Sequence, residues 1–225
     1  MPNRITESLG ELGRWMDIGL AAAIDRSRPG ELTRGIERDT CDTILARYPD
    51  LKIEVAILHG NQLDTAIGAA GESALSDGDL VQILIQGGKG PSILKACRTT
   101  CIGQPSPAQQ DFLTHLAEAA LWFEASLLPG DRRPFVLTET RARTLSVRAG
   151  ILHAAPDSEP LFALGEPVAL TEGMQLWVET SLSSREFGVG RVINPVRIGP
   201  KGVVPLIAFP LLPHPAHRGG PHDCE

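Results

Sequence analysis

Few residues in this sequence have the types and spacing that chemical centres require. The four cysteines form no Cys-x-x-Cys pair and indicate reduced thiols rather than a disulfide framework or a zinc site; they are Cys41, Cys97, Cys101 and Cys224. The glycine-rich run at 87–91 precedes no helix that starts with Lys-Ser or Lys-Thr, so it fits a hairpin turn better than a phosphate-binding loop. No Gly-x-Ser-x-Gly motif is present, so a serine hydrolase of the α/β type is not supported.

The composition is that of a globular protein. The chain has 225 residues, of which 42% are hydrophobic and 21% are charged, enough for one domain with a sizeable core. The formal net charge is −6 and the basic residues are scattered, so we expect no nucleic-acid partner. No run of about 18 apolar residues and no signal-peptide pattern is present, so we expect no membrane contact and a cytoplasmic location.

The hydrophobic pattern predicts helices and strands in a repeated order. Apolar residues at helical spacing predict one helix across 9–24 and a second across 32–48, separated by Pro29-Gly30. Short β-branched runs predict strands at 53–58, 80–86 and 93–102. Ser106 is predicted to cap, and Pro107 to begin, a third helix that ends before Pro129-Gly130. A second strand-rich stretch covers 134–209.

This order contains an internal repeat. Residues 75–83 resemble residues 170–178, because in both a turn with an acidic residue and a glycine precedes a strand. The offset is 95 residues here and 100 residues between the two Pro-Gly pairs. We therefore predict one domain at 1–209 with two similar halves, whose shared sheet would hold a ligand cleft. Residues 210–225 are rich in proline, glycine and polar residues and are predicted to be a flexible tail, in which His214, His217 and His222 are solvated.

The duplicated plan is similar to the pita-bread fold of creatinase, prolidase and methionine aminopeptidase. The segments that carry this resemblance are Ala22 to Glu31, Arg98-Thr99 with Gly103, Pro105 to Gly130, His153 to Pro156, and Gly173 to Glu179, within a match from about residue 18 to 204. The resemblance implies an α+β fold, in which two pseudo-symmetric halves share a curved, mostly antiparallel sheet with helices on its outer face. The segment from Gly130 to His153 is shorter than in that family, so the second helix of the second half is expected to be reduced or absent.

The resemblance also implies that the two-metal centre of the metallopeptidases is missing. Those enzymes hold two divalent cations with two aspartates, one histidine and two glutamates. Of these positions, only Glu179 keeps a ligand here; the others fall at Leu84, Lys95, near Ser146 and near Ile193, and Ile67 replaces a further histidine. Leucine donates nothing and an ammonium repels a cation. We therefore expect no metal, no other cofactor and no dinuclear metallopeptidase activity.

Five residues remain as candidates in the implied cleft. His153 matches the catalytic histidine of the family and can accept and donate a proton near neutral pH, although a structural histidine is the alternative. Lys95 and Glu179 are expected on neighbouring strands, paired either as a structural salt bridge or as a site in which Lys95 stabilises an anionic substrate or enolate. Arg98 and Arg191 are candidates for binding a substrate carboxylate, with a salt bridge at the rim as the alternative.

Two functions stay open. The first is a metal-independent enzyme that acts on a small carbonyl-bearing or anionic molecule by acid–base chemistry, leading to hydrolysis, isomerisation, cyclisation or elimination in a specialised biosynthetic or catabolic pathway. The alternative is a non-catalytic pseudoenzyme that binds a protein or a ligand, a use that the same fold has in histone-chaperone subunits. We favour the enzyme, with a small-molecule substrate, and allow for a homodimer.

Overall fold

A computed structural model describes residues 3–59, 72–89, 92–131, 137–139, 143–151 and 169–211. Its elements, in chain order, are α1 (Asn3–Arg26), α2 (Thr33–Leu45), β1 (Lys52–His59), β2 (Leu80–Lys89), β3 (Ser92–Cys101), α3 (Pro107–Ser126), β4 (Leu137–Glu139), β5 (Arg143–Ile151), β6 (Gln175–Ser184), β7 (Gly188–Gly199) and β8 (Gly202–Pro205). The predicted helices and the three strands of the first half are present. Ser106 caps α3 as predicted, in a capping box with Gln109.

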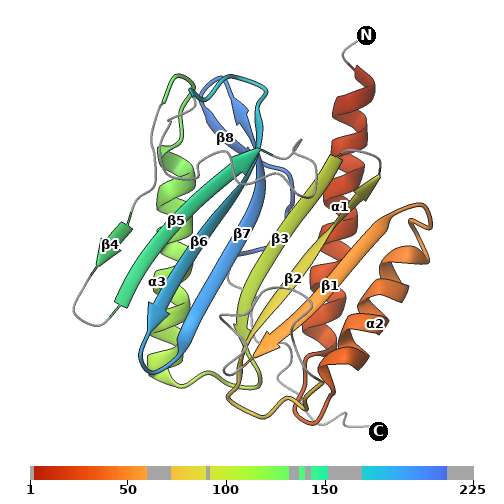
Figure 1. The fold of residues 1–225 in the computed structure, drawn as a ribbon, viewed down its shortest axis with the longest axis vertical. Coiled ribbons are helices and arrows are strands. Elements are labelled where there is room, and N and C mark those ends of the chain that lie inside the picture. The colour runs from red at the N-terminus through yellow and green to blue at the C-terminus, as the bar shows by residue number, and fades with distance from the viewer. Residues whose placement is uncertain are drawn as a thin grey trace, which may run out of the picture.

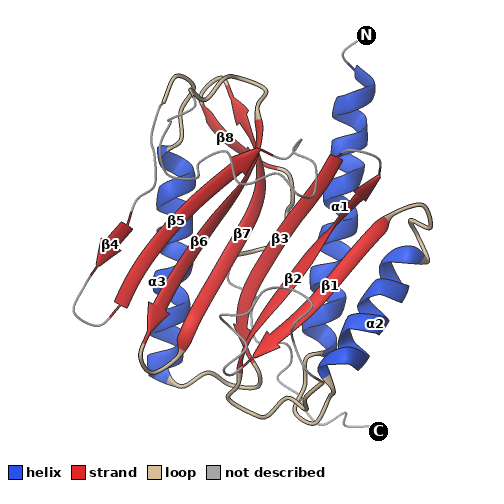
Figure 2. Cartoon of the chain, in the orientation of Figure 1, coloured by secondary structure: helices blue, strands red, loops and turns tan. Residues whose placement is uncertain are grey.

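The strands form one antiparallel sheet of eight strands, in the order β1-β2-β3-β7-β6-β5-β4, with β8 paired to β7. The two halves of the chain meet at β3 and β7. Helices α1 and α2 contact the strands of the first half, and α3 contacts β6 and β7. All three helices lie on the same side of the sheet (Figures 1 and 2). We call the opposite side of the sheet, which faces the viewer in Figure 1, the front face. The predicted α+β class is confirmed.

The core lies between the helices and the sheet. Trp15, Met16 and Leu20 of α1 are fully buried against Ile83 and Ile85 of β2. Phe123 of α3 packs in a second cluster with apolar side chains of β6 and β7, namely Leu176, Val178, Val196 and Ile198. Because side chains alternate across a strand, the residues between these core positions point to the front face.

The predicted internal repeat is confirmed by two pairs of matching turns. The amide of Gly30 donates to the carbonyl of Leu75, and the amide of Gly130 donates in the same way to the carbonyl of Leu170. Both glycines have positive φ, 88° and 89°, which side chains rarely allow. The turns before β2 and β6 match as well, because Gly78 donates to Ile102 and Gly173 donates to Ile198. Each half is therefore closed by the same backbone bonds.

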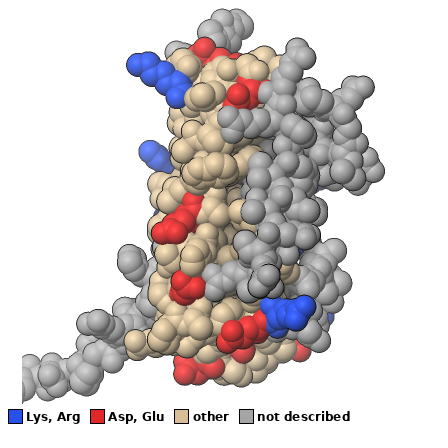
Figure 3. All heavy atoms as spheres, turned by 90° about the vertical axis from the view of Figure 1, so that its left-hand side faces the viewer, with Lys and Arg blue, Asp and Glu red and all other residues tan. Residues whose placement is uncertain are grey.

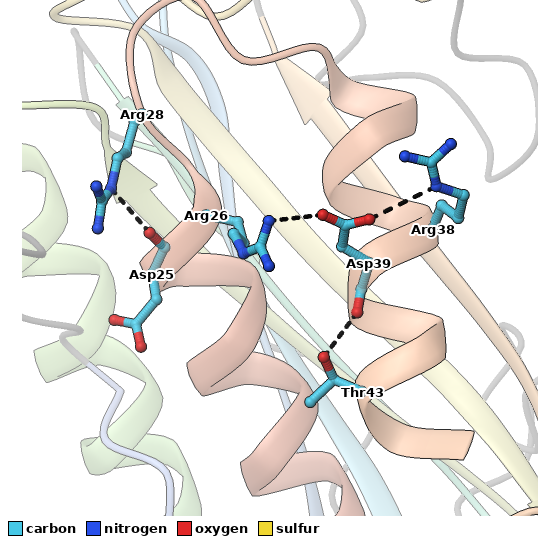
Figure 4. A network of polar contacts seen from close by, with 6 residues as sticks. All are labelled: Asp25, Arg26, Arg28, Arg38, Asp39 and Thr43. Atoms are coloured by element: carbon cyan, nitrogen blue, oxygen red, sulfur yellow. Dashed lines mark hydrogen bonds and ion pairs between the residues drawn. The ribbon is translucent and has the colours of Figure 1, made fainter. Parts of the chain in front are cut away.

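An exposed polar network joins α1 to α2 (Figure 4). Arg26 of α1 lies 2.6 Å from Asp39 of α2, which also lies 3.5 Å from Arg38. Thr43 donates to the carbonyl of Asp39 within α2. Because the arginines are mostly exposed, water and salt screen these pairs, and each contributes at most about 1 kcal/mol. The apolar contacts of both helices with the sheet stabilise their packing more than these ion pairs do.

Arg98 joins the two halves on the helix side of the sheet. Strands β3 and β7 share one ladder pair, Cys97 with Ile193. The Arg98 guanidinium donates from Nη1 to the carbonyls of Cys97 and Ile193, from Nε to Pro210 and from Nη2 to Phe209. Burial lowers the pKa of Arg98 to about 10, so it stays charged at neutral pH. The contact of Arg98 with Pro210 thus lies within the segment 210–225 that was predicted to be a flexible tail. Residues 212–225 lie outside the described residues.

Near this junction, the buried carboxyl of Glu124 on α3 accepts a hydrogen bond of 2.6 Å from Asn194 Nδ2. Burial raises the pKa of Glu124, while the bond from Asn194 and the charge of Arg98 oppose the rise. Ionisation of Glu124 therefore costs the folded state more than the unfolded state.

Among the described residues, none of the helices is long and apolar enough to cross a membrane.

We expect Arg98→Met to lower the free energy of unfolding by about 3–5 kcal/mol, because it leaves four carbonyl contacts without their shared donor. Urea unfolding monitored by circular dichroism measures this change. Arg38→Met, at an arginine with 75% of its side chain exposed, is the matched control and should stay within about 0.5 kcal/mol of the wild type. Equal losses in the two variants would contradict the proposed role of Arg98.

We expect Glu124→Gln to gain stability relative to the wild type as pH rises. The raised pKa of Glu124 means that the wild type has this group's full stability contribution below its unfolded value near 4.5 and loses it as pH rises through the folded value. The glutamine keeps an acceptor for Asn194 and does not ionise. Urea unfolding of both proteins at about pH 4.5 and about pH 8 tests this, and a variant whose stability relative to the wild type falls toward pH 8 would contradict it.

Candidate functional site

The strand register brings three of the positions that the resemblance assigns to metal ligands into one row on the front face. Leu84 of β2 pairs with Cys97 of β3, Cys97 pairs with Ile193 of β7, and Ile193 pairs with Glu179 of β6. Directly paired residues point to the same face of a sheet. The row crosses the junction between the halves, and the register continues it from Glu179 to Arg148 of β5.

Lys95 lies two residues before Cys97 on β3 and points to the same face. Its Nζ is 5.9 Å from the centroid of the Trp177 ring on β6, within the range of a cation–π contact. Among the described residues, no ion pair links Lys95 to a carboxylate. The predicted ion pair between Lys95 and Glu179 is not formed, and the two are not on neighbouring strands, because β7 lies between β3 and β6.

Glu179 is instead partnered by Arg191 of β7. Nε of Arg191 lies 3.3 Å from Oε1 of Glu179 without the alignment of a hydrogen bond, and Ser181 Oγ donates to the same oxygen at 3.3 Å. The Glu179 side chain is 11% exposed, and its carboxylate needs such a partner. Thr99 of β3 fixes the backbone of Arg191, because its hydroxyl accepts from the Arg191 amide and donates to the Arg191 carbonyl. Arg191 thus takes the place that was predicted for Lys95.

Cys97 lies at the centre of these charges but is not a nucleophile. Its side chain is completely buried, and burial raises the pKa of the thiol to about 12. The nearby cations Arg191, Arg98 and Lys95 oppose this rise and Glu179 adds to it, but desolvation is the largest effect. The group is therefore a neutral thiol near neutral pH, and it serves as a small apolar residue beneath the charged side chains.

The other candidate residues fall outside this group. Arg98 pairs with Ile83, whose side chain is in the helix-side core, so Arg98 points away from the front face and its donors serve main-chain carbonyls. Its proposed role in binding substrate does not fit this position, since adjacent strand residues face opposite sides. His153 and Ile67 lie outside the described residues.

The residues present do not fit the dinuclear metal centre that the fold implies. Leu84 and Ile193 offer no donor atoms, and the ammonium of Lys95 carries the wrong charge for a cation ligand. Within the described part of the chain, no three His, Cys, Asp or Glu residues are grouped so that they could hold a metal ion. We therefore derive no step that uses a metal.

Trp177 is not among the candidates that the sequence analysis names. Arg191 is among them, and the structure gives it the alternative role, a salt bridge, with Glu179 as the partner that the sequence analysis does not identify. Period-two alternation along β6 places Trp177, Glu179 and Ser181 on one face, and this signal was available from the sequence. The partner of Glu179 cannot be read from the sequence in this way, because it depends on the register of β7 against β6.

The surface next to α3 carries apolar residues. Leu121 and Trp122 of α3 are 57% and 61% exposed, and Leu128 follows the helix. Figure 3 shows the side of the molecule next to β4 and α3, where the charged side chains of the described residues are separated by uncharged surface. Exposed apolar surface of this kind is compatible with an interface. The homodimer stays a prediction.

Comparison with solved structures shows which fold this is. The prolidase from Pyrococcus horikoshii OT3 is 16% identical with a TM-score of 0.74, and the match covers 92% of this chain and 64% of the prolidase. The Xaa-Pro dipeptidase from Bacillus anthracis is 16% identical with a TM-score of 0.75, and the match covers 93% of this chain and 62% of the dipeptidase. The His350Ala variant of Escherichia coli aminopeptidase P is 16% identical with a TM-score of 0.74, and the match covers 95% of this chain and 57% of the aminopeptidase. No protein-family model and no curated protein matches the sequence.

The chain therefore has the pita-bread fold of these peptidases, as the sequence resemblance predicted. It spans less than two thirds of the length of each of the three structures. At 16% identity the likeness concerns the fold, and the chemistry has to be argued from the residues on the front face.

We expect the Cys97 thiol to be at least about tenfold slower to alkylate than Cys41 in the folded protein, because burial raises the pKa of both thiols but Cys97 is completely buried, whereas Cys41 is partly exposed to the reagent. Iodoacetamide treatment at about pH 8 followed by peptide mass spectrometry measures the ratio. Denatured protein is the control, in which both cysteines should react at similar rates. Rapid labelling of Cys97 in the folded protein would contradict its assignment as a neutral buried thiol.

Proposed function

We propose that this chain is a metal-independent enzyme that acts on a small carbonyl-bearing or anionic molecule by acid–base chemistry of its side chains. The observation that supports the proposal is the state of Lys95. At a position where the resemblance implies a metal-binding aspartate, the chain places an ammonium over an aromatic ring, and no described carboxylate pairs with it. A cation in this state can bind a negative group of a substrate.

The charges around Lys95 favour an anion. Lys95 and Arg191 are basic and Glu179 is acidic, and the register pairs a further basic residue, Arg148 of β5, with Glu179, so basic residues outnumber the acidic one. Since Arg191 already lies against Glu179, that carboxylate does not neutralise the charge of Lys95. In a partly buried site such a charge is screened less than at the surface and stabilises a carboxylate, an enolate or a developing oxyanion.

Trp177 gives Lys95 a defined place. The ring limits the directions that the ammonium can take, and it is an apolar surface against which a flat carbonyl compound can pack. A substrate held against both Lys95 and Trp177 would lie beside Glu179, which is two residues from Trp177 on β6. Glu179 then acts through Arg191 as a positioning residue, because its carboxylate already has a partner.

His153 is proposed as the residue that moves the proton. It follows the last residue of β5, Ile151, by two positions in the sequence, and Ile151 pairs with Leu176 beside Trp177. An imidazole can accept a proton from a carbon or a water and return it to the product, while Lys95 stabilises the negative charge. The proposed outcome is hydrolysis, isomerisation, cyclisation or elimination.

We also propose a specialised biosynthetic or catabolic pathway in the cytoplasm. The residues at the ligand positions differ from those of the metallopeptidases, which supports a substrate different from theirs. Cys41, Cys97 and Cys101 are free thiols, which supports a reducing compartment.

We expect Lys95→Met to lower turnover by at least about 100-fold, because the variant keeps the volume of the side chain and removes the charge that stabilises the substrate anion. The assay compares masses in a small-molecule extract after incubation with wild type, Lys95→Met and His153→Ala, with a chelator present throughout. Lys89→Met is the matched control, since Lys89 is 68% exposed and pairs with Asp50 at the far end of β2.

A mass that changes with the wild type and Lys89→Met, but not with Lys95→Met or His153→Ala, would support the proposal. Activity that appears only when the chelator is left out would contradict metal independence. If no mass changes with the wild type, the non-catalytic binding protein becomes the better account.

A further inference from the structure

Three polar side chains outside the front face meet where β1 ends. His59, the last residue of β1, has Nε2 2.5 Å from Ser73 Oγ. On the other side of the ring, Nδ1 lies 3.4 Å from Oδ2 of Asp79, which precedes β2, at ion-pair distance but without the alignment of a hydrogen bond. A serine, a histidine and an aspartate in contact through the two ring nitrogens have the order of contacts found in catalytic triads.

These residues belong to a different surface from the proposed site around Lys95. His59 pairs with Val81, and the Val81 side chain is buried in the helix-side core, so His59 is on the helix side of the sheet. Lys95 and Glu179 point to the front face. A function of the His59 group would therefore be separate from the one proposed above, and neither depends on the other.

The backbone holds the serine and the aspartate in place. The Ser73 carbonyl accepts from the Thr33 amide at 3.0 Å, and Thr33 Oγ1 accepts from the Ser73 amide at 3.4 Å. The Asp79 carbonyl accepts from the Ile102 amide, and its carboxylate accepts from the Ser76 amide at 2.8 Å. Both residues lie in segments fixed by the repeated turns, so the arrangement does not depend on side-chain contacts alone.

The group is shielded but not closed off. The His59 side chain is 15% exposed and that of Asp79 is 30% exposed, and Ser73 is half-buried. Partial burial strengthens the contact between the ring and the carboxylate relative to a contact in water. The remaining exposure lets a small molecule reach the serine.

From this geometry we propose that Ser73, His59 and Asp79 form a second catalytic site that hydrolyses small esters, with Ser73 as the nucleophile. Neutral His59 with its proton on Nδ1, facing Asp79, presents the Nε2 lone pair to the Ser73 hydroxyl. Ser73 Oγ attacks the ester carbonyl carbon while its proton passes to Nε2. Asp79 stabilises the imidazolium that forms.

The cycle closes with water. The tetrahedral intermediate breaks its bond to the alcohol oxygen, which takes the proton from Nε2 and leaves, so that the acyl group remains on Ser73. Water then attacks the acyl carbon and gives a proton to Nε2. The bond to Ser73 Oγ breaks, the proton returns to Oγ, and the carboxylic acid is released. One ester and one water give one acid and one alcohol.

Helix α2 supplies a positive end beside the serine. It begins at Thr33, the residue whose amide donates to the Ser73 carbonyl, and no side chain caps the helix at Leu32. The positive end of the helix dipole favours negative charge that develops on the carbonyl oxygen. Leu32 is 46% exposed and forms a bridge with Ala74, so apolar surface adjoins the serine and favours a short aliphatic acyl group.

The full chain treated with a fluorophosphonate, a reagent for activated serines, tests the proposal. We expect one adduct, located on Ser73 by peptide mass spectrometry, and hydrolysis of p-nitrophenyl acetate that falls by at least about 100-fold in Ser73→Ala. The adduct should also be lost in His59→Asn. Ser76→Ala is the matched control, because Ser76 is exposed in the same turn and contacts Asp79 through its main-chain amide.

An adduct on Ser73 that forms in the wild type and in Ser76→Ala would support the site. Absence of the adduct from wild-type Ser73, or unchanged ester hydrolysis in Ser73→Ala, would overturn it and leave the group as a structural link between β1 and β2. Circular dichroism of each variant separates loss of activity from loss of folding. Because the assay uses a supplied ester, a failure of the reaction proposed at Lys95 does not affect its outcome.

Discussion

The contact between β3 and β7 is the constraint on which the rest of the molecule depends. The halves share one ladder pair, and side chains of described residues add further bonds across the junction: Arg98 to the Ile193 carbonyl, Thr99 to both main-chain groups of Arg191, and Gln82 to the Val189 carbonyl. A guanidinium has five N–H donors and can bond several carbonyls at once, whereas a backbone amide in a strand ladder has one. Dense hydrogen bonding offsets the cost of burying that charge.

This junction determines the chemistry of the front face. It places Cys97 against Ile193, and therefore sets Lys95 and Glu179 on either side of β7 rather than next to each other. Arg191 reaches Glu179 because its backbone is fixed by Thr99. The result is a neutralised carboxylate at Glu179 and a cation over a tryptophan at Lys95, both at positions where the sequence resemblance implies metal ligands in peptidases of this fold, with the buried thiol of Cys97 near them. An anion-binding site follows more naturally from this set than a cation-binding one.

The internal repeat also shows where the halves differ. The turn before β2 and the turn before β6 make matching backbone bonds, but Asp79 of the first corresponds to Met174 of the second. The His59 group is thus confined to the first half, where the turn carries a carboxylate. The shared backbone is fixed by glycines with positive φ and by main-chain bonds, so side chains at these turns are free to differ.

The sequence by itself determined the local structure. Apolar spacing located the helices, Ser106-Pro107 located the start of α3, and the two Pro-Gly turns revealed the repeat, because each of these depends on residues close together in the chain. Tertiary structure alone decided the partners. Arg98 turned to the helix side, Arg191 instead of Lys95 paired with Glu179, and His59 met Ser73 and Asp79, because a shift of one residue in strand register reverses the face of every side chain. Such contacts depend on how distant strands align, and no local pattern in the sequence specifies that alignment.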